Sequence, residues 1–478
     1  MNKINAWLKK YSWAAVGVTI VFGFAACDFI DPTKVENPQT TDENLRGNGK
    51  GATTPFLVGV QERFSDAVED LITFTDPVSD NYDNTSTFIS PQADFPADIR
   101  PDDLTLDGNI GGSPFFETQE LRALVEFALR EVVPNDPDAT NEQRAELLFY
   151  RGMASLLLAE NFAGAPIEEN GRALTPAEHI QLAIRDFQQA LTTSQHNGFV
   201  TRLYLAAARA YRLAGDAANA NALADAAIAS GPADFVFFAQ YDAENNTNAG
   251  WTFAVSRGTA DLQPLPRLDF LDPKYIENNT PIPVLKMEEA HLIKAEAALS
   301  LGIVNAATQY LGEAINLAKS RPVAAFADRD PRRSRPRGGA AQAGPNAAPV
   351  DGLILARGGA VVQAHPISGT SLDAGAVASL DNPAEILRTL YQARQEIFYY
   401  ESRRMSDLGI RLPMMNREIG TNPAIKPGDP GTFVIVPGYI PAGDGLDRFT
   451  VNGNATIIES DLNQILAENR VSPFTLPF

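Results

Sequence analysis

Small and hydrophobic residues recur at helical spacing in three stretches of the chain. In the stretch 199–232 a large aromatic residue, small residues, a turn glycine and a final proline follow the spacing of a tetratricopeptide repeat of about 34 residues. The same order returns over 286–320, and a third copy with a longer turn lies at 144–191. Two helices approach closely only where one presents alanine or glycine to a bulky side chain of the other. The pattern therefore predicts helix pairs.

The copies agree in the size of the residue at each position, small or large, and not in residue type. They are Tyr204, Ala208, Tyr211, Gly215, Ala220, Ala224, Ala227 and Pro232; His291, Ala295, Ala298, Gly302, Ala307, Leu311 and Ala314; and Leu148, Gly152, Ala183, Phe187 and Ala190. No pair buries its apolar face alone, so we expect the pairs to stack on one another. The alternative is a set of unrelated alanine-rich amphipathic helices.

Three intervening segments lack sustained helical periodicity. The segments 52–116, 233–285 and 321–384 are rich in Pro, Gly, Asn and Asp, which predicts long irregular inserts. After them, apolar residues at helical spacing predict a last helix over 383–408. We assign no role to the Arg, Gly and Ala-rich stretch 329–348. The expected fold is mainly all-α, with stacked tetratricopeptide-like pairs and an irregular, loop-rich face.

The N-terminus has the features of a bacterial lipoprotein signal. Lysines precede an uncharged run over 11–26, which is shorter than the roughly 20 residues that span a membrane as a helix. The run ends in small residues before Cys27, the only cysteine, and this resembles a lipobox with Phe24 in place of the usual Leu. We therefore expect a signal peptide over 1–26 and a lipidated Cys27. A free cysteine after an uncleaved helix is the alternative.

Downstream of Cys27, the polar, turn-rich segment 27–51 is expected to be a flexible tether, and 52–478 a single domain. With 59 acidic against 39 basic residues the net charge is −20, which disfavours nucleic acid as a partner, because such binding depends on neutralising phosphates. The only membrane association that we expect is through the lipid anchor.

No pattern in the sequence supports catalysis. The four histidines are scattered without a metal-binding spacing, and no Gly-x-Ser-x-Gly motif exists. We therefore expect no enzyme activity, no cofactor and no catalytic metal. The acidic loop 76–84 is left open as a calcium site, although it lacks the spacing of a known calcium loop.

Four motifs together resemble the SusD/RagB family of outer-membrane lipoproteins, which cover the outer face of a TonB-dependent nutrient transporter. The motifs are Arg151-Gly152-Met153-Ala154 with the exit Gly164-Ala165-Pro166-Ile167; Asp272-Pro273-Lys274-Tyr275; the run from Ile282 to Ala297; and Glu401-Ser402-Arg403-Arg404-Met405-Ser406-Asp407-Leu408, in which Ser402 replaces the family's Gly. The resemblance covers most of residues 27–408.

Charged residues in these motifs are expected to be structural. Glu401, Arg404 and Asp407 are spaced by three, so on one helix Arg404 could bridge both carboxylates. Glu296 is expected to accept a hydrogen bond from a backbone or arginine partner in the same way.

The resemblance also implies where a ligand would bind. The family places its ligand contacts in the loop after the first helix and in the insert before the second repeat block. Aromatic rings and amides, which suit sugars and peptides, occur in both regions. The candidates are Asn81, Tyr82, Asn84, Phe88 and Phe95 in the first region, and Tyr241, Asn245, Asn246 and Trp251 in the second. The alternative is that the aromatic residues only anchor their loops to the helices.

The predicted function is non-catalytic capture of an oligosaccharide or peptide at the cell exterior and its delivery to a SusC-like TonB-dependent barrel in the outer membrane. The alternative is an envelope lipoprotein that acts as a protein-binding adaptor. A third hypothesis, a surface glycosidase or peptidase, has no positive support in the sequence.

Overall fold

The computed structural model describes residues 49–84, 95–108, 112–194, 196–255, 262–328 and 335–469. Cys27, the signal segment and all but the end of the predicted tether lie outside these residues. Among the residues that the structure describes, no helix is both long and apolar enough to cross a membrane.

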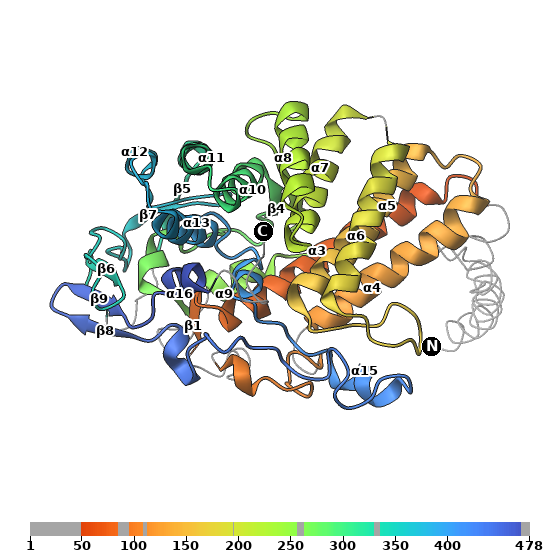
Figure 1. Ribbon diagram of the computed structural model, residues 1–478. Coiled ribbons are helices and arrows are strands. Elements are labelled where there is room, and N and C mark those ends of the chain that lie inside the picture. The colour runs from red at the N-terminus through yellow and green to blue at the C-terminus, as the bar shows by residue number, and fades with distance from the viewer. Residues whose placement is uncertain are drawn as a thin grey trace, which may run out of the picture.

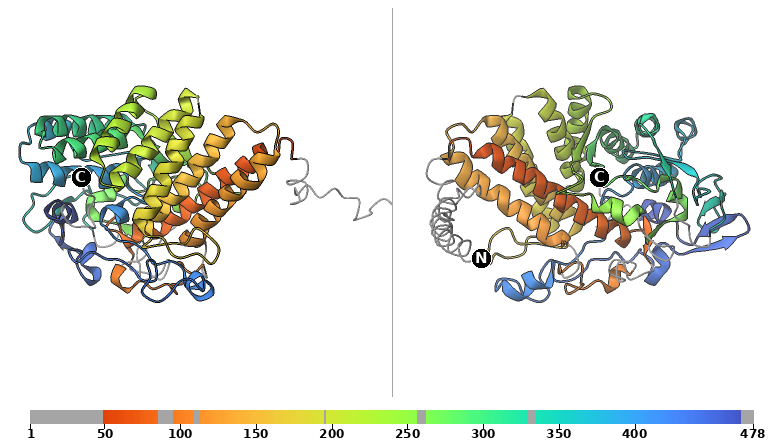
Figure 2. Two further views of the ribbon diagram at one scale, coloured as in Figure 1. Left: turned by 45° about the vertical axis from the view of Figure 1, so that its right-hand side comes forward. Right: turned by 180° about the vertical axis from the view of Figure 1, so that it is seen from behind.

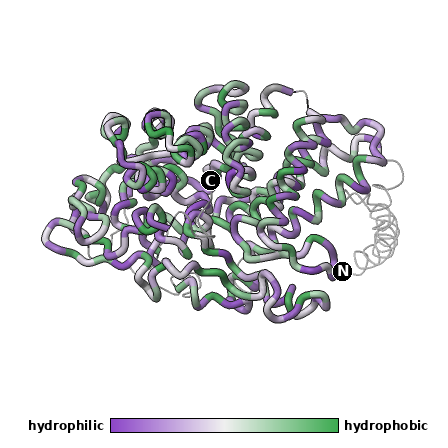
Figure 3. The backbone as a smooth tube through the Cα atoms, viewed as in Figure 1, coloured by the Kyte–Doolittle hydropathy of each residue, from purple (hydrophilic) through white to green (hydrophobic). Residues whose placement is uncertain are grey.

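The three predicted helix pairs are present. They are α5 (Asn141–Asn161) with α6 (Pro176–Thr193), α7 (Asn197–Leu213) with α8 (Ala217–Ser230), and α10 (Met287–Ser300) with α11 (Val304–Ser320). Each helix in this series packs on the next, so the pairs form one continuous stack, which Figures 1 and 2 show from three sides. Hydrophobic and hydrophilic residues both occur along these helices (Figure 3). Helices α6, α7 and α11 are amphipathic, as expected of such repeats, whereas α10 is buried on nearly every side.

Local sequence explains where the first pair begins and why it packs closely. Thr140 and Thr175 each cap a helix with their side chain, and the side chain of the residue three positions later returns a bond to the cap backbone. Within the pair, a Cβ atom placed on Gly152 would come within 2.5 Å of the Phe187 ring. Only glycine permits this approach, as the small-against-large pattern predicts.

The prediction that 52–116 lacks helices was wrong. This segment contains α3 (Thr53–Val78), which has 26 residues, and the start of α4 (Pro114–Phe127). Helix α3 buries Leu57, Val60 and Phe64 at helical spacing and packs against α4 and α5. The Pro, Gly, Asn and Asp residues that suggested an insert are concentrated after α3, and the whole-segment composition concealed the regular pattern before them.

The other two inserts are irregular, as predicted. The insert 233–285 contains the short elements β2 (Val236–Ala239), α9 (Ala249–Val255), β3 (Leu262–Pro264) and most of β4 (Ile282–Lys286); the insert 321–384 contains β5 (Ala324–Ala327), β6 (Ala340–Ala343), β7 (Val361–Ala364) and α12 (Ala374–Ala378). The remaining strands are β1 (Tyr82–Asn84), β8 (Phe449–Asn452) and β9 (Ala455–Ile458).

These strands form small sheets rather than one large layer. The pairs β1–β3, β2–β4 and β5–β7 are antiparallel. In the three-stranded sheet β6–β9–β8, β6 and β9 run parallel and β8 and β9 run antiparallel. Short 3₁₀ and π-helical segments complete the fold: η3 (Pro96–Asp98), η4 (Ala128–Val132), η5 (Val133–Asn135), η6 (Pro266–Leu271) and η7 (Gly443–Leu446).

The predicted last helix, 383–408, is interrupted. Helix α13 (Pro383–Ile397) ends before a turn, and α14 (Arg404–Asp407) is a separate short helix. Tyr400 and Ser402 have φ angles of 55° and 56°, which a right-handed helix cannot contain. Glycine adopts this conformation with least strain, and Ser402 stands where the resembling motif has glycine. The chain continues through α15 (Asn416–Thr421) and α16 (Leu462–Glu468).

Candidate ligand-binding groove

The structure does not place Asn81 and Tyr82 where a ligand could reach them. Both are fully buried, and both use their polar groups internally. The Asn81 amide donates to Asp76 Oδ1 at 2.6 Å and its carbonyl accepts from Gln395 Nε2 at 3.1 Å. Tyr82 donates from its hydroxyl to Asp272 Oδ1 at 3.0 Å. The expectation that these two residues contact ligand is therefore corrected, because they are part of the core.

Burial at this position also changes the acidity of Asp76. Desolvation raises the pKa of Asp76 to about 7, against the opposing hydrogen bonds from Asn81 and from the backbone N–H of Ser402. A calcium ion in this loop would need free side-chain oxygen atoms as ligands. The side chains of Asp76, Asp80 and Asn81 instead form hydrogen bonds with other protein groups. Within the described residues no cluster of His, Cys, Asp and Glu suits a metal ion.

The remaining candidates of the first region are only partly described. Asn84 belongs to β1, where its backbone pairs with Leu262. Phe88 lies outside the described residues. Phe95 precedes η3 and exposes 37% of its surface, so its ring is accessible. The pairing of β1 with β3 brings the ends of the two predicted regions together, although they are far apart in the sequence.

Trp251 lies on α9, which packs against α3. Its indole is half-buried, and its Nε1 atom has no hydrogen-bond partner among the described residues. The helix is held in place by Glu69, which accepts from the backbone N–H of Ala249 at 3.0 Å. Burial raises the pKa of Glu69 to about 7. Trp251 therefore stays a candidate ligand-binding residue. Its position depends on the contact between α9 and α3.

Tyr241 and its neighbours line an open groove of about 860 Å³, which we call the β2 groove. One wall is the N-terminal half of α3, and the other is formed by β2 and the loop that follows it. Tyr241 donates from its hydroxyl to the Ser65 carbonyl at 2.7 Å, and the Gln240 backbone donates to Ser65 Oγ. The groove is lined by Val58, Gln61, Glu62, Phe64, Ser65, Glu146, Tyr150, Arg202, Val236, Phe237, Phe238, Ala239, Gln240, Tyr241, Asp242, Asn245 and Asn246.

An aromatic cluster supports one side of the groove. The Arg202 guanidinium lies 3.9 Å from the centre of the Phe199 ring and 5.1 Å from that of Phe237. Its charge is balanced by Glu146, with Nη2 and Oε1 2.9 Å apart. Cation–π contacts of this kind attract the guanidinium to the faces of the rings. The Arg202 side chain is therefore held in the groove wall by contacts within the protein.

Polar groups of the opposite wall are organised by Asp242. Its Oδ1 atom accepts from the backbone N–H groups of Glu244 and Asn245, both at 2.7 Å. These bonds lower the pKa of Asp242. The loop exposes Asn245 and half-exposes Asn246, whose side-chain amide forms no hydrogen bond with the described residues. An amide that both donates and accepts suits the hydroxyl groups of a sugar or the backbone of a peptide.

The sequence did not single out the other half of this groove. Tyr150, Arg202 and Phe237 were missed because they lie within repeat helices or a short strand, where they read as packing residues. The only available signal was an arginine that follows Phe199 by three residues on the same helix, a spacing at which a guanidinium can lie over a ring.

The motif residues are buried in ion pairs, but the partners of some differ from those predicted. Arg404 pairs with Asp80, with Nη2 and Oδ2 2.9 Å apart, and does not bridge Glu401 and Asp407. The predicted bridge was wrong because Glu401 lies before α14, and because Asp407, although it is on α14 with Arg404, is paired with Arg394. Glu401 instead accepts from Lys286 at 2.6 Å and from Lys274.

The two remaining motif carboxylates bind arginines from other helices. Glu296 accepts from Arg212 Nε at 2.6 Å, which confirms the arginine partner expected for it. Asp407 receives two bonds from Arg394, at 2.8 and 2.9 Å. Although burial opposes ionisation, Arg394 and Arg212 lower the pKa of Asp407 to about 2. The Glu296 pair joins two repeat helices, and Arg212 Nη1, which lies 3.6 Å from Asp407 Oδ1, connects them to the C-terminal segment.

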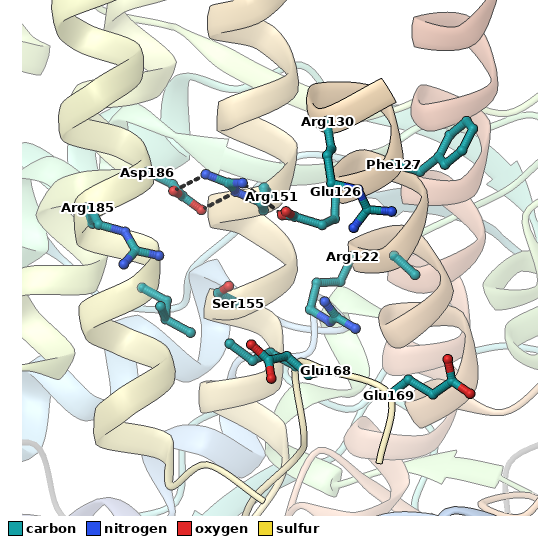
Figure 4. Close-up of a pocket in the computed structure, with 13 residues that line it drawn as sticks. Arg122, Glu126, Phe127, Arg130, Arg151, Ser155, Glu168, Glu169, Arg185 and Asp186 are labelled. Atoms are coloured by element: carbon teal, nitrogen blue, oxygen red, sulfur yellow. Dashed lines mark hydrogen bonds and ion pairs between the residues drawn. The ribbon is translucent and has the colours of Figure 1, made fainter. Parts of the chain in front are cut away.

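A second pocket, of about 570 Å³, opens between α4, α5 and α6 (Figure 4). Arg151 lies at its centre and donates to Asp186 and Glu126. The pocket shares no residue with the β2 groove.

Similarity to known proteins is found at the level of structure. No family model matches the sequence, and no curated protein is significantly similar to it. A SusD superfamily protein from Bacteroides fragilis is 11% identical, with a TM-score of 0.54 over 79% of this chain and 99% of that one. A SusD/RagB family protein from Bacteroides thetaiotaomicron is 13% identical, with a TM-score of 0.50 over 78% and 94%.

A third similar structure, from Bacteroides vulgatus, carries a description that proposes sugar binding. It is 15% identical, with a TM-score of 0.50 over 80% of this chain and 90% of that one. At such identities the likeness establishes the fold. The chain is therefore a mainly α-helical protein of stacked helix pairs with a loop-rich face. Its fold is that of the SusD-like proteins, as the sequence resemblance predicted.

Proposed function

We propose that this protein captures an oligosaccharide at the cell exterior, without chemical change, and delivers it to a TonB-dependent transporter of the outer membrane. The observation that carries the proposal is the β2 groove, which combines aromatic surface with an accessible asparagine amide. Its volume of about 860 Å³ falls within the roughly 300–1,000 Å³ range typical of small-ligand sites.

The chemistry of the groove favours a neutral ligand. Glu62, Glu146 and Asp242 line it, and Arg202 is its only basic lining residue and is already paired. A strongly anionic glycan would be repelled by this wall, whereas hydroxyl groups can donate to the carboxylates. The SusD-like fold and the sugar-binding description of the Bacteroides vulgatus structure support the same choice.

The binding test is calorimetry of the purified full-length chain against matched panels of neutral glycans, acidic glycans and peptides. We expect a neutral glycan to bind and Asn246→Ala to weaken it. Asn221→Ala, which removes a half-buried asparagine from α8 outside the groove, is the matched control. Binding by peptides alone, or equal affinities in both variants, would contradict the proposed ligand or its site.

Anchoring and orientation need a separate experiment. We expect mass spectrometry of the native protein to find Cys27 acylated, and protease added to intact cells to cleave the chain. A Cys27→Ala variant should be released from the membrane fraction. Complete protection of the wild-type chain would favour the envelope-adaptor hypothesis. Co-purification with an outer-membrane barrel after mild crosslinking tests delivery.

A further inference from the structure

The pocket in Figure 4 contains more charge than its internal pairs use. Its lining includes four arginines and four carboxylates from α4, α5, α6 and the segment after α5. Arg151 is fully neutralised, since its Nη2 atom lies 2.8 Å from Asp186 and its Nη1 atom lies 2.8 Å from Glu126. These three residues form a paired cluster at the centre of the pocket.

Two other arginines of this pocket have no carboxylate within ion-pair distance among the described residues. Arg122 reaches from α4 into the space in front of α5, and its Nε atom donates only to the Gln119 side chain, at 2.8 Å. Burial lowers the pKa of Arg122 in spite of the more distant charges of Glu126, Glu418 and Glu168. Arg185, on α6, is exposed and makes no ion pair with the described residues.

Two carboxylates on the other side of the opening are also unpaired. Glu168 and Glu169 follow α5 and have no cation within ion-pair distance in the described parts of the chain. Figure 4 shows both below Arg122: the Glu168 carboxylate lies beneath Ser155, whereas that of Glu169 points away from the arginines. Two unpaired guanidinium groups therefore face the pocket from α4 and α6, and the unpaired Glu168 carboxylate faces it from the loop.

We propose that this pocket is a second binding site, separate from the β2 groove, that takes a small zwitterion with both a free carboxylate and a protonated amine, such as a short peptide. Arg122 and Arg185 hold the ligand carboxylate, because a guanidinium matches carboxylate geometry with parallel N–H groups. Glu168 holds the amine. A ligand with only one of these charges satisfies one side and is repelled by the other.

Ser155 and Leu182 also line the pocket. A hydroxyl and an aliphatic side chain suit the middle of a peptide, which is less polar than its ends. A volume of about 570 Å³ accommodates a few residues and not an extended chain. The site therefore recognises free termini, which an internal segment of a protein does not offer.

The test uses triglycine, N-acetyl-triglycine and triglycine amide in calorimetric titrations of the full-length chain. We expect triglycine to bind and each blocked form to bind at least about tenfold more weakly, since each loses one charged contact. Arg122→Gln and Arg185→Gln should abolish the preference for a free carboxylate. Glu168→Gln should abolish the preference for a free amine. Arg144→Gln, an exposed arginine of α5 outside the pocket, should change neither preference.

Equal binding of the three peptides would overturn the proposal, as would the absence of binding at millimolar peptide. Retention of both preferences in Arg122→Gln and Arg185→Gln would also overturn it. Arg185 is exposed, so its variant keeps the test valid if Arg122→Gln fails to fold. Asn246→Ala separates this site from the proposed function, because it should weaken a glycan in the β2 groove and leave triglycine binding unchanged.

Discussion

The two halves of helix α3 are built for different purposes. In its N-terminal half, Val58 is 58% exposed and, with Gln61, Glu62 and Ser65, lines the β2 groove. From Leu71 to Val78 every residue is buried, and the chain continues into the buried Asn81 and Tyr82. Asparagine and tyrosine occur at both ends of the helix. Asn81 and Tyr82 follow the buried half, whereas Tyr241, Asn245 and Asn246 line the groove beside the exposed half. Residue type alone therefore does not separate a binding residue from a core residue.

The largest effect is expected from Tyr82→Ala at the buried end. Its ring packs against Tyr399 and Tyr400, with the centres of the rings 5.4 and 5.1 Å apart. Removing a buried ring should lower the free energy of unfolding by about 3–5 kcal/mol, measured by chemical denaturation. Tyr82→Phe keeps the ring and should lose less. Undiminished stability with weaker ligand binding would show that this segment opens to solvent.

A smaller loss is expected from Asn81→Ala. The substitution leaves Asp76 and Gln395 without the amide that joins them in the core. An unsatisfied buried polar group costs about 1–3 kcal/mol, so the denaturation midpoint should fall by a corresponding amount. Ligand affinity of the folded fraction should be unchanged. If stability is unaffected, then water replaces the amide and the region is less closed than the structure indicates.

Between the two halves of α3, Asp70 makes stability depend on pH. Burial, with the nearby charge of Glu69, raises the pKa of Asp70 from 3.8 to about 8, and its Oδ2 atom has no partner among the described residues. The folded protein keeps this proton where the unfolded chain has lost it. The free energy of unfolding should therefore fall as pH rises from about 4 to 8.

Asp70→Asn removes this contribution. The melting temperatures of the variant and the wild type should be similar near pH 4 and should diverge toward pH 8, where the variant is the more stable. The measurement is a series of thermal scans at constant ionic strength. Parallel profiles across this range would mean that Asp70 is ionised in the folded protein and that this part of α3 is hydrated.

The smallest effect is expected at the open end. Asn246→Ala removes one amide from the groove without disturbing a hydrogen bond within the described protein, so the melting temperature should stay the same. Affinity for the captured ligand should fall by about 0.5–1.5 kcal/mol, up to roughly tenfold in Kd. Together with Asn81→Ala, this variant compares an asparagine in the core with an asparagine in the groove. If both variants changed stability and ligand affinity in the same way, the two ends of α3 would not differ as the structure indicates.

The sequence predicted the helix pairs because their packing depends on residue spacing. Gly152 meets Phe187, and Ala208, Ala224 and Ala295 are fully buried, as the small-against-large pattern requires. Helix α3 was missed because its segment was judged as a whole by its turn-forming residues. The break before Arg404 was missed because nothing in an apolar periodicity signals a left-handed residue at Tyr400.

The candidate site was predicted less well than the fold. Tyr241, Asn245 and Asn246 lie together at the groove, whereas Asn81 and Tyr82 do not reach it. Arg202 and Tyr150 entered the site only through the packing of α7 and α5 against β2. The partners of Arg404 and Glu401 likewise come from segments that are distant in the sequence.

By itself, the sequence determined the helix pairs, because amphipathic spacing and the positions of small residues are local properties of the chain. The SusD-like fold was expected from the resemblance of its motifs to those of the family. Only the tertiary structure decided which asparagine is accessible, which arginines are neutralised and which are left over. Exposure and charge pairing depend on what packs against a residue, and here the packing partners lie tens to hundreds of residues away. For that reason the same side chain stabilises the core at one end of α3 and is free to bind at the other.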